Sequence, residues 1–199
     1  MSFGGGSGSA FLDPLIGKTT TFVVEAREAN IKFAQALGDS IAKTTFSCIV
    51  FDLDALYASN ADIIFTRATN AASSFTVDIP GPGSDIESEF SSLLKTQQEV
   101  VIIDSLNTLY HLISTEDGSS KARKMMFALA SLSLFARENH RAIVMSMYRR
   151  DGFAKPGKGR PISSLSDIAA SVDVKGDGLE VKTERGSAWP RGVFSIRIP

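Results

Sequence analysis

The sequence predicts an α/β fold built on a mostly parallel central sheet, with helices on both faces and an antiparallel extension at the C-terminal end. Two observations lead to this prediction. Short apolar runs of strand character alternate with longer segments in which apolar residues recur at helical spacing. Near the C-terminus, three strand-like runs follow one another closely, which is typical of antiparallel strands.

The first half of the chain opens with a Gly/Ser-rich stretch, and we expect residues 1–10 to be flexible. The remainder, residues 11–199, is expected to form a single domain. The run TTFVVE at 20–25 predicts a buried strand, because it is rich in β-branched and aromatic residues. Further elements expected here are a helix at 29–43, a strand at 46–53, weaker strands at 61–65 and 75–79, and a helix at 86–94.

The second half continues the alternation with the strongly apolar strand EVVIID at 99–104. A long helix is predicted at 119–138, followed by a strand at 141–147. The helix side chains expected to face inward are Met125, Leu129, Leu132, Leu134 and Phe135. The tail is expected to hold a helical turn at 164–170 and strands at 171–174, 179–183 and 192–198.

Composition limits the functions that the chain can serve. With 21 basic and 22 acidic residues, the net charge is -1, so nucleic-acid binding would require a local basic patch. A structural zinc site is not expected, because the soft ligands are Cys48, His111 and His140. No stretch approaches the roughly 20 apolar residues of a membrane helix, and the N-terminus does not read as a signal peptide. We therefore expect no membrane partner and a cytoplasmic location, with nucleoid association if the protein binds DNA.

Three stretches in this order carry a resemblance to a known superfamily: GSGSAFLDPLIG at 6–17, VVIIDSLNTLY at 100–110 and VKTERGSAWPRGVFSIRI at 181–198. The first resembles the entry segment of archaeal RadA, RadB and KaiC-like proteins. The second is similar to a Walker B strand, and the third to the closing hairpin of KaiC-like and RadB-like cores. The chain thus resembles the RecA/RadA recombinase superfamily, which implies a RecA-like P-loop ATPase core.

The phosphate-binding loop of that superfamily is degenerate in this sequence. The pattern G-x-x-x-x-G-K-[ST] supplies backbone amides and a lysine to the phosphates. At the matching position, Glu25 and Asn30 replace the two glycines, Ile31 replaces the lysine, and Lys32 replaces the Ser/Thr. Negative charge at Glu25 and Glu28 would also repel a triphosphate. ATPase activity and a bound cofactor are therefore not expected.

A second match to part of the pattern, GKTT at 17–20, is a decoy. It stands before the predicted strand, whereas a phosphate-binding loop joins a strand to the helix that follows it. The amides of a segment that enters a strand would not converge on phosphates. We expect no nucleotide at this position.

Other parts of the ATPase site are retained in part, and the resemblance implies their roles. Asp104 matches the Walker B acid that holds Mg²⁺, and Asp54 falls where relatives carry the glutamate that activates water. Arg185 matches the arginine of the closing R-G-S, which reaches a neighbouring subunit's nucleotide in KaiC-like relatives. Residues 147–148 (Met-Tyr) replace a polar pair that senses the nucleotide. Two alternatives remain open: Asp104 as a structural acid left at the end of its strand, where it could cap Ser105 or Asn107, and Arg185 as an interface residue or a plain surface cation.

A basic loop at 149–160 is the candidate DNA contact, because the superfamily's loop at this place contacts single-stranded DNA. Flexible cations bind phosphates, and an aromatic ring can stack on a base. Its candidate residues are Arg149, Arg150, Phe153, Lys155, Lys158 and Arg160. A second candidate loop at 114–124 contributes Lys121, Arg123 and Lys124. The alternative is that both loops are solvated charged segments without a ligand.

These observations lead to one functional hypothesis and two alternatives. The hypothesis is a non-catalytic RecA/RadA paralogue, an accessory factor in homologous recombination and DNA repair. Its partners would be single-stranded DNA, a RecA/RadA-type recombinase or another paralogue, in a homo- or hetero-oligomer. The first alternative is a divergent ATPase that still binds ATP and Mg²⁺. The second is a KaiC-like signalling or scaffolding module that binds protein.

Overall fold

The computed structural model describes residues 9–65, 75–81, 83–113, 118–149, 166–186 and 193–197 of the chain. These residues form an eight-stranded sheet with the order β3-β2-β4-β5-β1-β6-β7-β8. The strands are β1 (Lys18–Val24), β2 (Cys48–Asp52), β3 (Phe75–Asp78), β4 (Val100–Asp104), β5 (Ala142–Tyr148), β6 (Ile168–Lys175), β7 (Gly178–Arg185) and β8 (Val193–Arg197). The helices are α1 (Ser9–Leu12), the 3₁₀ helix η1 (Asp13–Leu15), α2 (Arg27–Ala42), α3 (Leu56–Ser59), α4 (Ala61–Ile64), α5 (Ile86–Leu93), α6 (Leu106–Leu112) and α7 (Gly118–Glu138).

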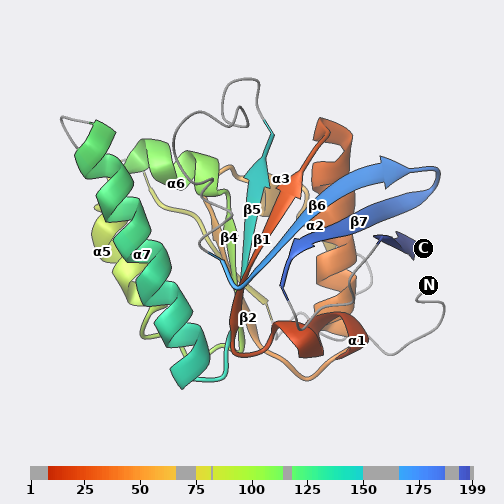
Figure 1. The fold of residues 1–199 in the computed structure, drawn as a ribbon, viewed down its shortest axis with the longest axis horizontal. Helices are drawn as coiled ribbons and strands as arrows, with labels where there is room; N and C mark the ends of the chain where they lie inside the picture. The colour runs from red at the N-terminus through yellow and green to blue at the C-terminus, as the bar shows by residue number, and fades with distance from the viewer. Residues whose placement is uncertain are drawn as a thin grey trace.

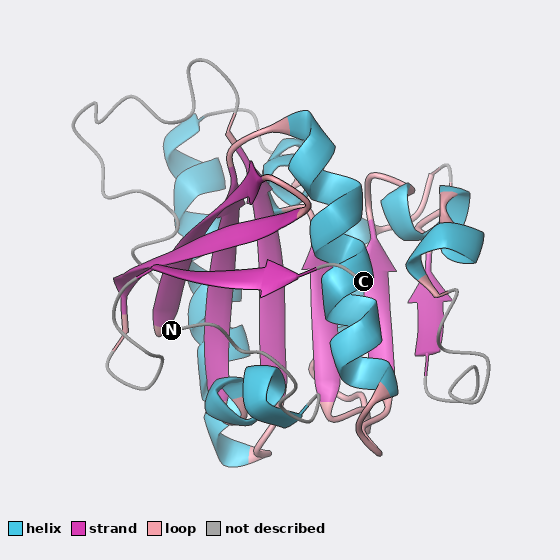
Figure 2. Cartoon of the chain, turned by 90° about the vertical axis from the view of Figure 1, so that its right-hand side faces the viewer, coloured by secondary structure: helices cyan, strands magenta, loops and turns pink. Residues whose placement is uncertain are grey.

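Neighbouring strands from β3 to β6 in this spatial order are parallel, whereas β7 and β8 are antiparallel. Helices α5, α6 and α7 lie on one side of the sheet, and α1 and α2 lie on the other (Figure 1). The view onto that second side shows α2 packed along the strands (Figure 2). The α/β fold with a mostly parallel sheet and an antiparallel C-terminal extension is therefore confirmed.

The central strands are buried on both faces, as their continuous apolar sequence predicts. In β4, Val100 and Ile102 pack in the core on the α2 side, and Val101 and Ile103 pack in the core beneath α5, α6 and α7. Alternate residues of a strand point to opposite faces, so one apolar run serves two cores. The polar side chains that end these strands are thereby held in place from both sides.

The segment at 61–65, predicted as a weak strand, is helical, so that prediction is wrong. Ala61–Ile64 forms α4, which packs against α2. The approach is close, because a Cβ added at Gly38 of α2 would lie 3.0 Å from the backbone oxygen of Ile64. A short apolar run does not by its periodicity distinguish a strand from a buried helix.

Two other predictions of local structure are corrected. The turn predicted at 164–170 is not helical in its described part, because β6 begins at Ile168 and pairs with β1. On α7, Leu134 was expected to face inward, but 57% of its surface is exposed. Ser9 and Ala10 belong to α1. Residues 1–8, the rest of the segment predicted to be flexible, lie outside the described residues.

The described residues supply neither a membrane span nor a metal cluster. None of their helices is both long and apolar enough to cross a bilayer. Within the same ranges, no group of three or more His, Cys, Asp or Glu is placed to hold a metal ion. Cys48 is free and buried, and burial raises the pKa of its thiol.

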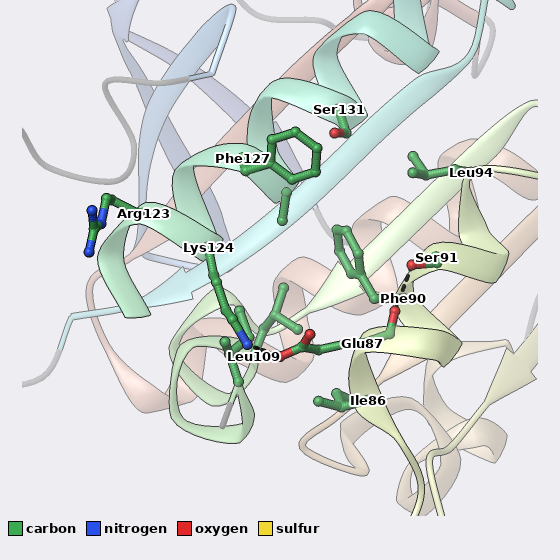
Figure 3. A pocket seen from close by; sticks show the side chains of 12 residues that line it. Ile86, Glu87, Phe90, Ser91, Leu94, Leu109, Arg123, Lys124, Phe127 and Ser131 are labelled. Carbon is green, nitrogen blue, oxygen red and sulfur yellow. Dashed lines mark hydrogen bonds and ion pairs between the residues drawn. The ribbon is translucent and has the colours of Figure 1, made fainter. Parts of the chain in front are cut away.

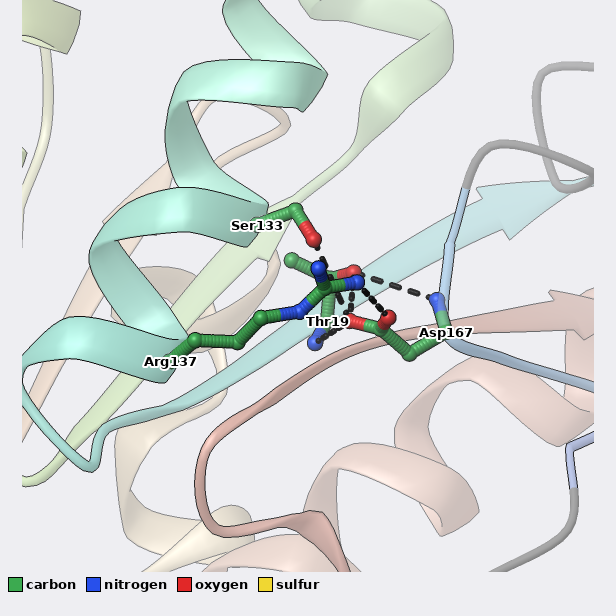
Figure 4. A network of polar contacts seen from close by, with 4 residues as sticks. All are labelled: Thr19, Ser133, Arg137 and Asp167. Atoms are coloured by element: carbon green, nitrogen blue, oxygen red, sulfur yellow. Dashed lines mark hydrogen bonds and ion pairs between the residues drawn. The ribbon is translucent and has the colours of Figure 1, made fainter.

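The GKTT segment enters a strand, as expected. β1 begins at Lys18, whose Nζ donates to the backbone oxygen of Pro14 at 2.9 Å. Thr19 lies in a polar network with Ser133, Arg137 and Asp167 that joins β1 to α7 and the start of β6 (Figure 4). These contacts give the segment a structural role.

Candidate functional site

The carboxyl ends of the parallel strands meet at one edge of the sheet, which is where α/β folds bind ligands. A cavity of about 500 Å³ lies at this edge. Its lining residues are Val24, Glu25, Ala26, Asn30, Asp54, Leu56, Tyr148 and Arg149. They come from the ends of β1 and β5, the start of α2, and the segment between β2 and α3. The resemblance assigns the nucleotide to this same edge.

The connection from β1 to α2 is two residues long. Glu25 donates its backbone N–H to the oxygen of Val172 at 2.9 Å, and α2 begins at Arg27. The N–H of Ala29 already bonds the oxygen of Ala26 at 3.0 Å. Residues 27–33 of the stretch aligned with the phosphate loop are therefore helical. From Ala29 onward their amides bond within the helix, and none of these positions is a glycine.

Glu25 forms an ion pair that sequence reasoning missed. Arg149 Nη1 lies 2.5 Å from Glu25 Oε2, and the side chains are 54% and 22% exposed respectively. The backbone N–H of Arg149 also donates to the oxygen of Val24 at 3.0 Å. The negative charge expected to repel phosphate is thus matched by a cation at the mouth of the cavity.

Asp104 at the end of β4 is covered by two hydroxyl groups. Tyr148 Oη and Ser146 Oγ, both from β5, donate hydrogen bonds to Asp104 Oδ1. Asp104 is 1% exposed, and its Oδ2 atom is buried without a hydrogen-bond partner. Burial raises the pKa of Asp104 to about 6, although the bonds from Ser146 and Tyr148 oppose this shift. With these contacts Asp104 is a buried acid at the end of its strand, and its role as a cation ligand stays a prediction.

Asp54 holds the start of the helix that follows β4. Its Oδ2 accepts from Ser105 Oγ at 2.6 Å, and its Oδ1 accepts from Thr108 Oγ1 at 2.5 Å. Its backbone N–H donates to the oxygen of Asp104 at 3.2 Å. Asn107 fixes the end of β5, because its side chain bonds both the N–H and the C=O of Tyr148, at 2.8 and 3.1 Å. Asp54 and Asp104 therefore both accept hydrogen bonds from side chains of the protein.

The role of Tyr148 was not found from the sequence, although its unusual position was noted. β4 and β5 are parallel neighbours in which Ile103 lies opposite Met145. This register places Asp104 beside Ser146, within reach of Tyr148. The missing information was therefore the order of the strands in the sheet, and local composition does not contain it.

The candidate DNA residues are only partly described. Arg150, Phe153, Lys155, Lys158 and Arg160 lie outside the described residues. Of the candidate DNA residues on this stretch, Arg149 is described and lines the cavity. Arg185, which the resemblance assigned to a nucleotide and not to DNA, ends β7 opposite Ala169, outside the cavity lining. Whether these residues contact DNA stays a prediction.

The cations expected on a second loop lie on a helix, since α7 begins at Gly118. Lys121 Nζ donates to the oxygen of His111 at 3.2 Å and lies 5.4 Å from the centre of a tyrosine ring. Lys124 pairs with Glu87 of α5 at 2.7 Å. Arg123 lines an apolar groove. The three side chains are thus spread around one end of α7.

Comparison with known proteins establishes the fold. Neither a protein-family model nor a curated protein sequence matches this chain. Among solved structures, the crystal structure of the RadB recombinase superposes with a TM-score of 0.68 at 17% identity. The match covers 100% of this chain and 94% of that chain. The RecA-like core that the sequence motifs implied is therefore confirmed as a fold.

Proposed function

From the RecA-like fold shared with the RadB recombinase, we propose that this protein is a non-catalytic RecA/RadA paralogue. It acts as an accessory factor in homologous recombination and DNA repair. It works by binding single-stranded DNA, the main recombinase or another paralogue, rather than by hydrolysing ATP. A fold by itself does not specify function, so the proposal depends on the contacts of particular residues.

The contact that carries the non-catalytic part is the pair of hydroxyl groups on Asp104. In P-loop ATPases a Walker B aspartate helps to hold Mg²⁺ next to the phosphates. Here Ser146 and Tyr148 take the place that a hydrated cation would need, and the acid is 1% exposed.

The β1–α2 connection supports the same conclusion. A phosphate cradle needs several free amides that converge on the anion. At Glu25 and Ala26 the chain turns within two residues, and the carboxylate of Glu25 is paired with Arg149. A triphosphate would have to displace this ion pair without gaining a phosphate loop.

The DNA-binding part is supported by the cations at 149–160 and by the placement of Arg149. This residue leaves the sheet at the end of β5 with half of its side chain exposed. A guanidinium paired with a carboxylate at the surface can exchange that partner for a phosphate, because exposed ion pairs contribute little stability. The other cations of the basic stretch at 149–160 follow Arg149 in the sequence.

A titration of a labelled 30-residue oligo-dT at several salt concentrations tests the proposal. We expect binding that weakens as salt rises, and further weakening when Arg149, Arg150, Lys155 and Lys158 are changed to alanine. A charge-matched control changes four exposed lysines elsewhere, namely Lys43, Lys95, Lys175 and Lys182. Absence of binding at low salt, or equal loss in both variants, would reject the DNA contact. The same titration with the host's main recombinase present tests whether the two proteins act together.

The divergent ATPase remains the second candidate, since a cavity of about 500 Å³ exists at the strand ends. Calorimetric titration with Mg-ATP distinguishes the divergent ATPase from the non-catalytic paralogue. The proposal predicts no measurable heat of binding at micromolar nucleotide. Micromolar affinity that is lost on Asp104→Ala would favour the ATPase. Binding of protein partners without any DNA binding would favour the scaffolding module.

A further inference from the structure

A second cavity, unrelated to the strand ends, lies between α5, α6 and α7. It encloses about 410 Å³, which is within the usual size range of ligand pockets. Its floor is apolar, because Phe90 is 8% exposed, Leu109 1% and Ile113 5%. Phe90 of α5 and Phe127 of α7 extend from the two helices that border it (Figure 3). We call this cavity the α5–α7 groove.

The rim of the α5–α7 groove carries a large apolar side chain that is exposed to solvent. Phe127, which lines the groove, is 76% exposed. Contiguous exposed apolar surface beside a concave apolar floor marks interaction sites. A large apolar side chain from another molecule would cover this exposed surface.

The charges at the rim of the groove indicate which kind of molecule would bind there. Lys124 pairs with Glu87 across the groove, from α7 to α5, at 2.7 Å. Arg123 also lines the groove, and within the described residues it makes no hydrogen bond or ion pair. The rim thus carries two cations and one anion, an excess of one positive charge. A carboxylate next to an apolar side chain would complement this arrangement.

We propose that the α5–α7 groove binds a short peptide segment of a partner protein, in which a large apolar side chain stands beside an acidic residue. The apolar side chain enters between Phe90 and Phe127, and the carboxylate pairs with Arg123. Buried aromatic contacts supply most of the affinity in such sites, and rim charges supply orientation. Single-stranded DNA fits less well, because Lys124 is already paired and one cation neutralises few phosphates.

This inference goes beyond the proposed function, since it requires neither DNA binding nor recombination. The experiment begins with a phage-displayed library of random 12-residue peptides, selected on the intact protein at neutral pH. Selection is repeated on Phe127→Ala and on Arg123→Glu. Enrichment of peptides that combine a large apolar residue with Asp or Glu is expected on the wild type and on neither variant. Failure to enrich any sequence, or enrichment of the same peptides on both variants, overturns the proposal.

The most enriched peptide is then synthesised with a fluorescent label and titrated by anisotropy. Phe127→Ala and Arg123→Glu should each weaken its binding about tenfold, a loss typical of one important contact. Leu134→Ala is the matched control, because Leu134 lies on the same helix, is 57% exposed and does not line the groove. Affinity should stay unchanged in that variant, and equal loss in all three contradicts the assignment. All three changes are at exposed or rim positions, and thermal unfolding confirms that each variant is folded.

Two competitors separate the peptide from other occupants. Oligo-dT should not displace the labelled peptide, whereas unlabelled peptide should. Displacement by oligo-dT at matched affinity would assign the groove to nucleic acid instead. Sedimentation should show that the unliganded protein does not self-associate through the groove. Self-association that Phe127→Ala abolishes would identify a second copy of the chain as the occupant. Both outcomes leave the DNA titration of the basic loop unaffected, so failure of this inference is distinct from failure of the proposed function.

Discussion

Tyr148 at the end of β5 donates its hydroxyl hydrogen bond to the carboxylate of Asp104 at the end of β4. Ser146 donates to the same oxygen, and the other carboxylate oxygen is buried without a partner. An ionised carboxylate in such a place loses its hydration without full compensation. This explains why burial raises the pKa of Asp104 to about 6. The site that resembles a cation-binding acid is thus a buried, partly satisfied carboxyl group.

The first prediction concerns the pH dependence of stability at Asp104. The folded pKa of about 6 lies above the value of about 3.9 in an unfolded chain, so the folded state binds the proton more tightly. The contribution of Asp104 is therefore most favourable below about pH 4 and declines as pH rises to about 6. Asp104→Asn should be more stable than the wild type at pH 7.5, by about 1–3 kcal/mol, with the difference shrinking towards pH 4.5. Urea unfolding at both pH values measures this difference in unfolding free energy.

The control for this prediction is Asp177→Asn, an exposed carboxylate in the turn between β6 and β7. Its unfolding free energy relative to the wild type should be the same at both pH values. A constant difference between Asp104→Asn and the wild type from pH 4.5 to 7.5 would contradict the raised pKa. Comparing variants with the wild type cancels the titration of the carboxylates that do not interact with Asp104.

The second prediction isolates the contact between Tyr148 and Asp104. Tyr148→Phe removes one of two hydroxyl donors and should cost about 1–2 kcal/mol of unfolding free energy at pH 7.5. In the Asp104→Asn background the same change should cost less, because the acceptor no longer carries a charge. A double-mutant cycle by chemical denaturation gives the coupling energy between the two residues. A coupling near zero would show that the hydroxyl group contributes nothing to holding the carboxylate.

The predictions from sequence succeeded where local pattern decides structure. The apolar runs at 99–104 and 141–147 correspond to β4 and β5, and the long helix at 119–138 corresponds to α7. Each element is long, and its apolar period matches one type of structure. The run at 61–65 failed for the opposite reason, because it is short and its packing against α2 decides its conformation.

The candidate site was predicted less completely than the fold. Asp54 and Asp104 were identified because acids at strand ends are visible in sequence. Their actual partners depend on which strands are neighbours: Tyr148 lies 44 residues from Asp104, and Arg149 lies 124 residues from Glu25. Contacts over such separations follow from the sheet order, which no local pattern encodes.

The third prediction concerns the ion pair between Glu25 and Arg149. If Arg149 contacts phosphate, Glu25 competes with DNA for the same guanidinium. Glu25→Gln should therefore strengthen oligo-dT binding about two- to fivefold at low salt, and Arg149→Ala should abolish that gain. Glu28→Gln removes an equal charge three residues further along the chain, at an exposed position in the first turn of α2, and is the control. An equal gain in both glutamine variants would point to net charge rather than to the ion pair. Fluorescence anisotropy measures binding for the wild type, the two glutamine variants, Arg149→Ala, and the double variant with Glu25→Gln and Arg149→Ala.

The fourth prediction concerns Asp167, which connects β6 to β1 and α7 (Figure 4). It accepts from the N–H and the hydroxyl of Thr19, both at 2.9 Å, and from Ser133 and Arg137 at 3.3 and 2.5 Å. Asp167→Ala leaves the buried Thr19 amide without its acceptor and should cost about 2–3 kcal/mol. Arg137→Ala should cost less than about 1 kcal/mol, because the arginine side chain is 63% exposed.

The pH dependence of the Asp167 contribution has the opposite sign to that of Asp104. Burial would raise the pKa of Asp167, but hydrogen bonds from Thr19 and Arg137 outweigh it and lower the pKa. The stabilisation is therefore complete above the unfolded pKa of about 3.9 and is lost as pH falls through the lower folded pKa. Asp167→Asn should consequently lose more stability at pH 6 than at pH 3, as measured by urea unfolding. Equal losses at both pH values would mean that the amide of Thr19, rather than charge, accounts for the contribution of Asp167.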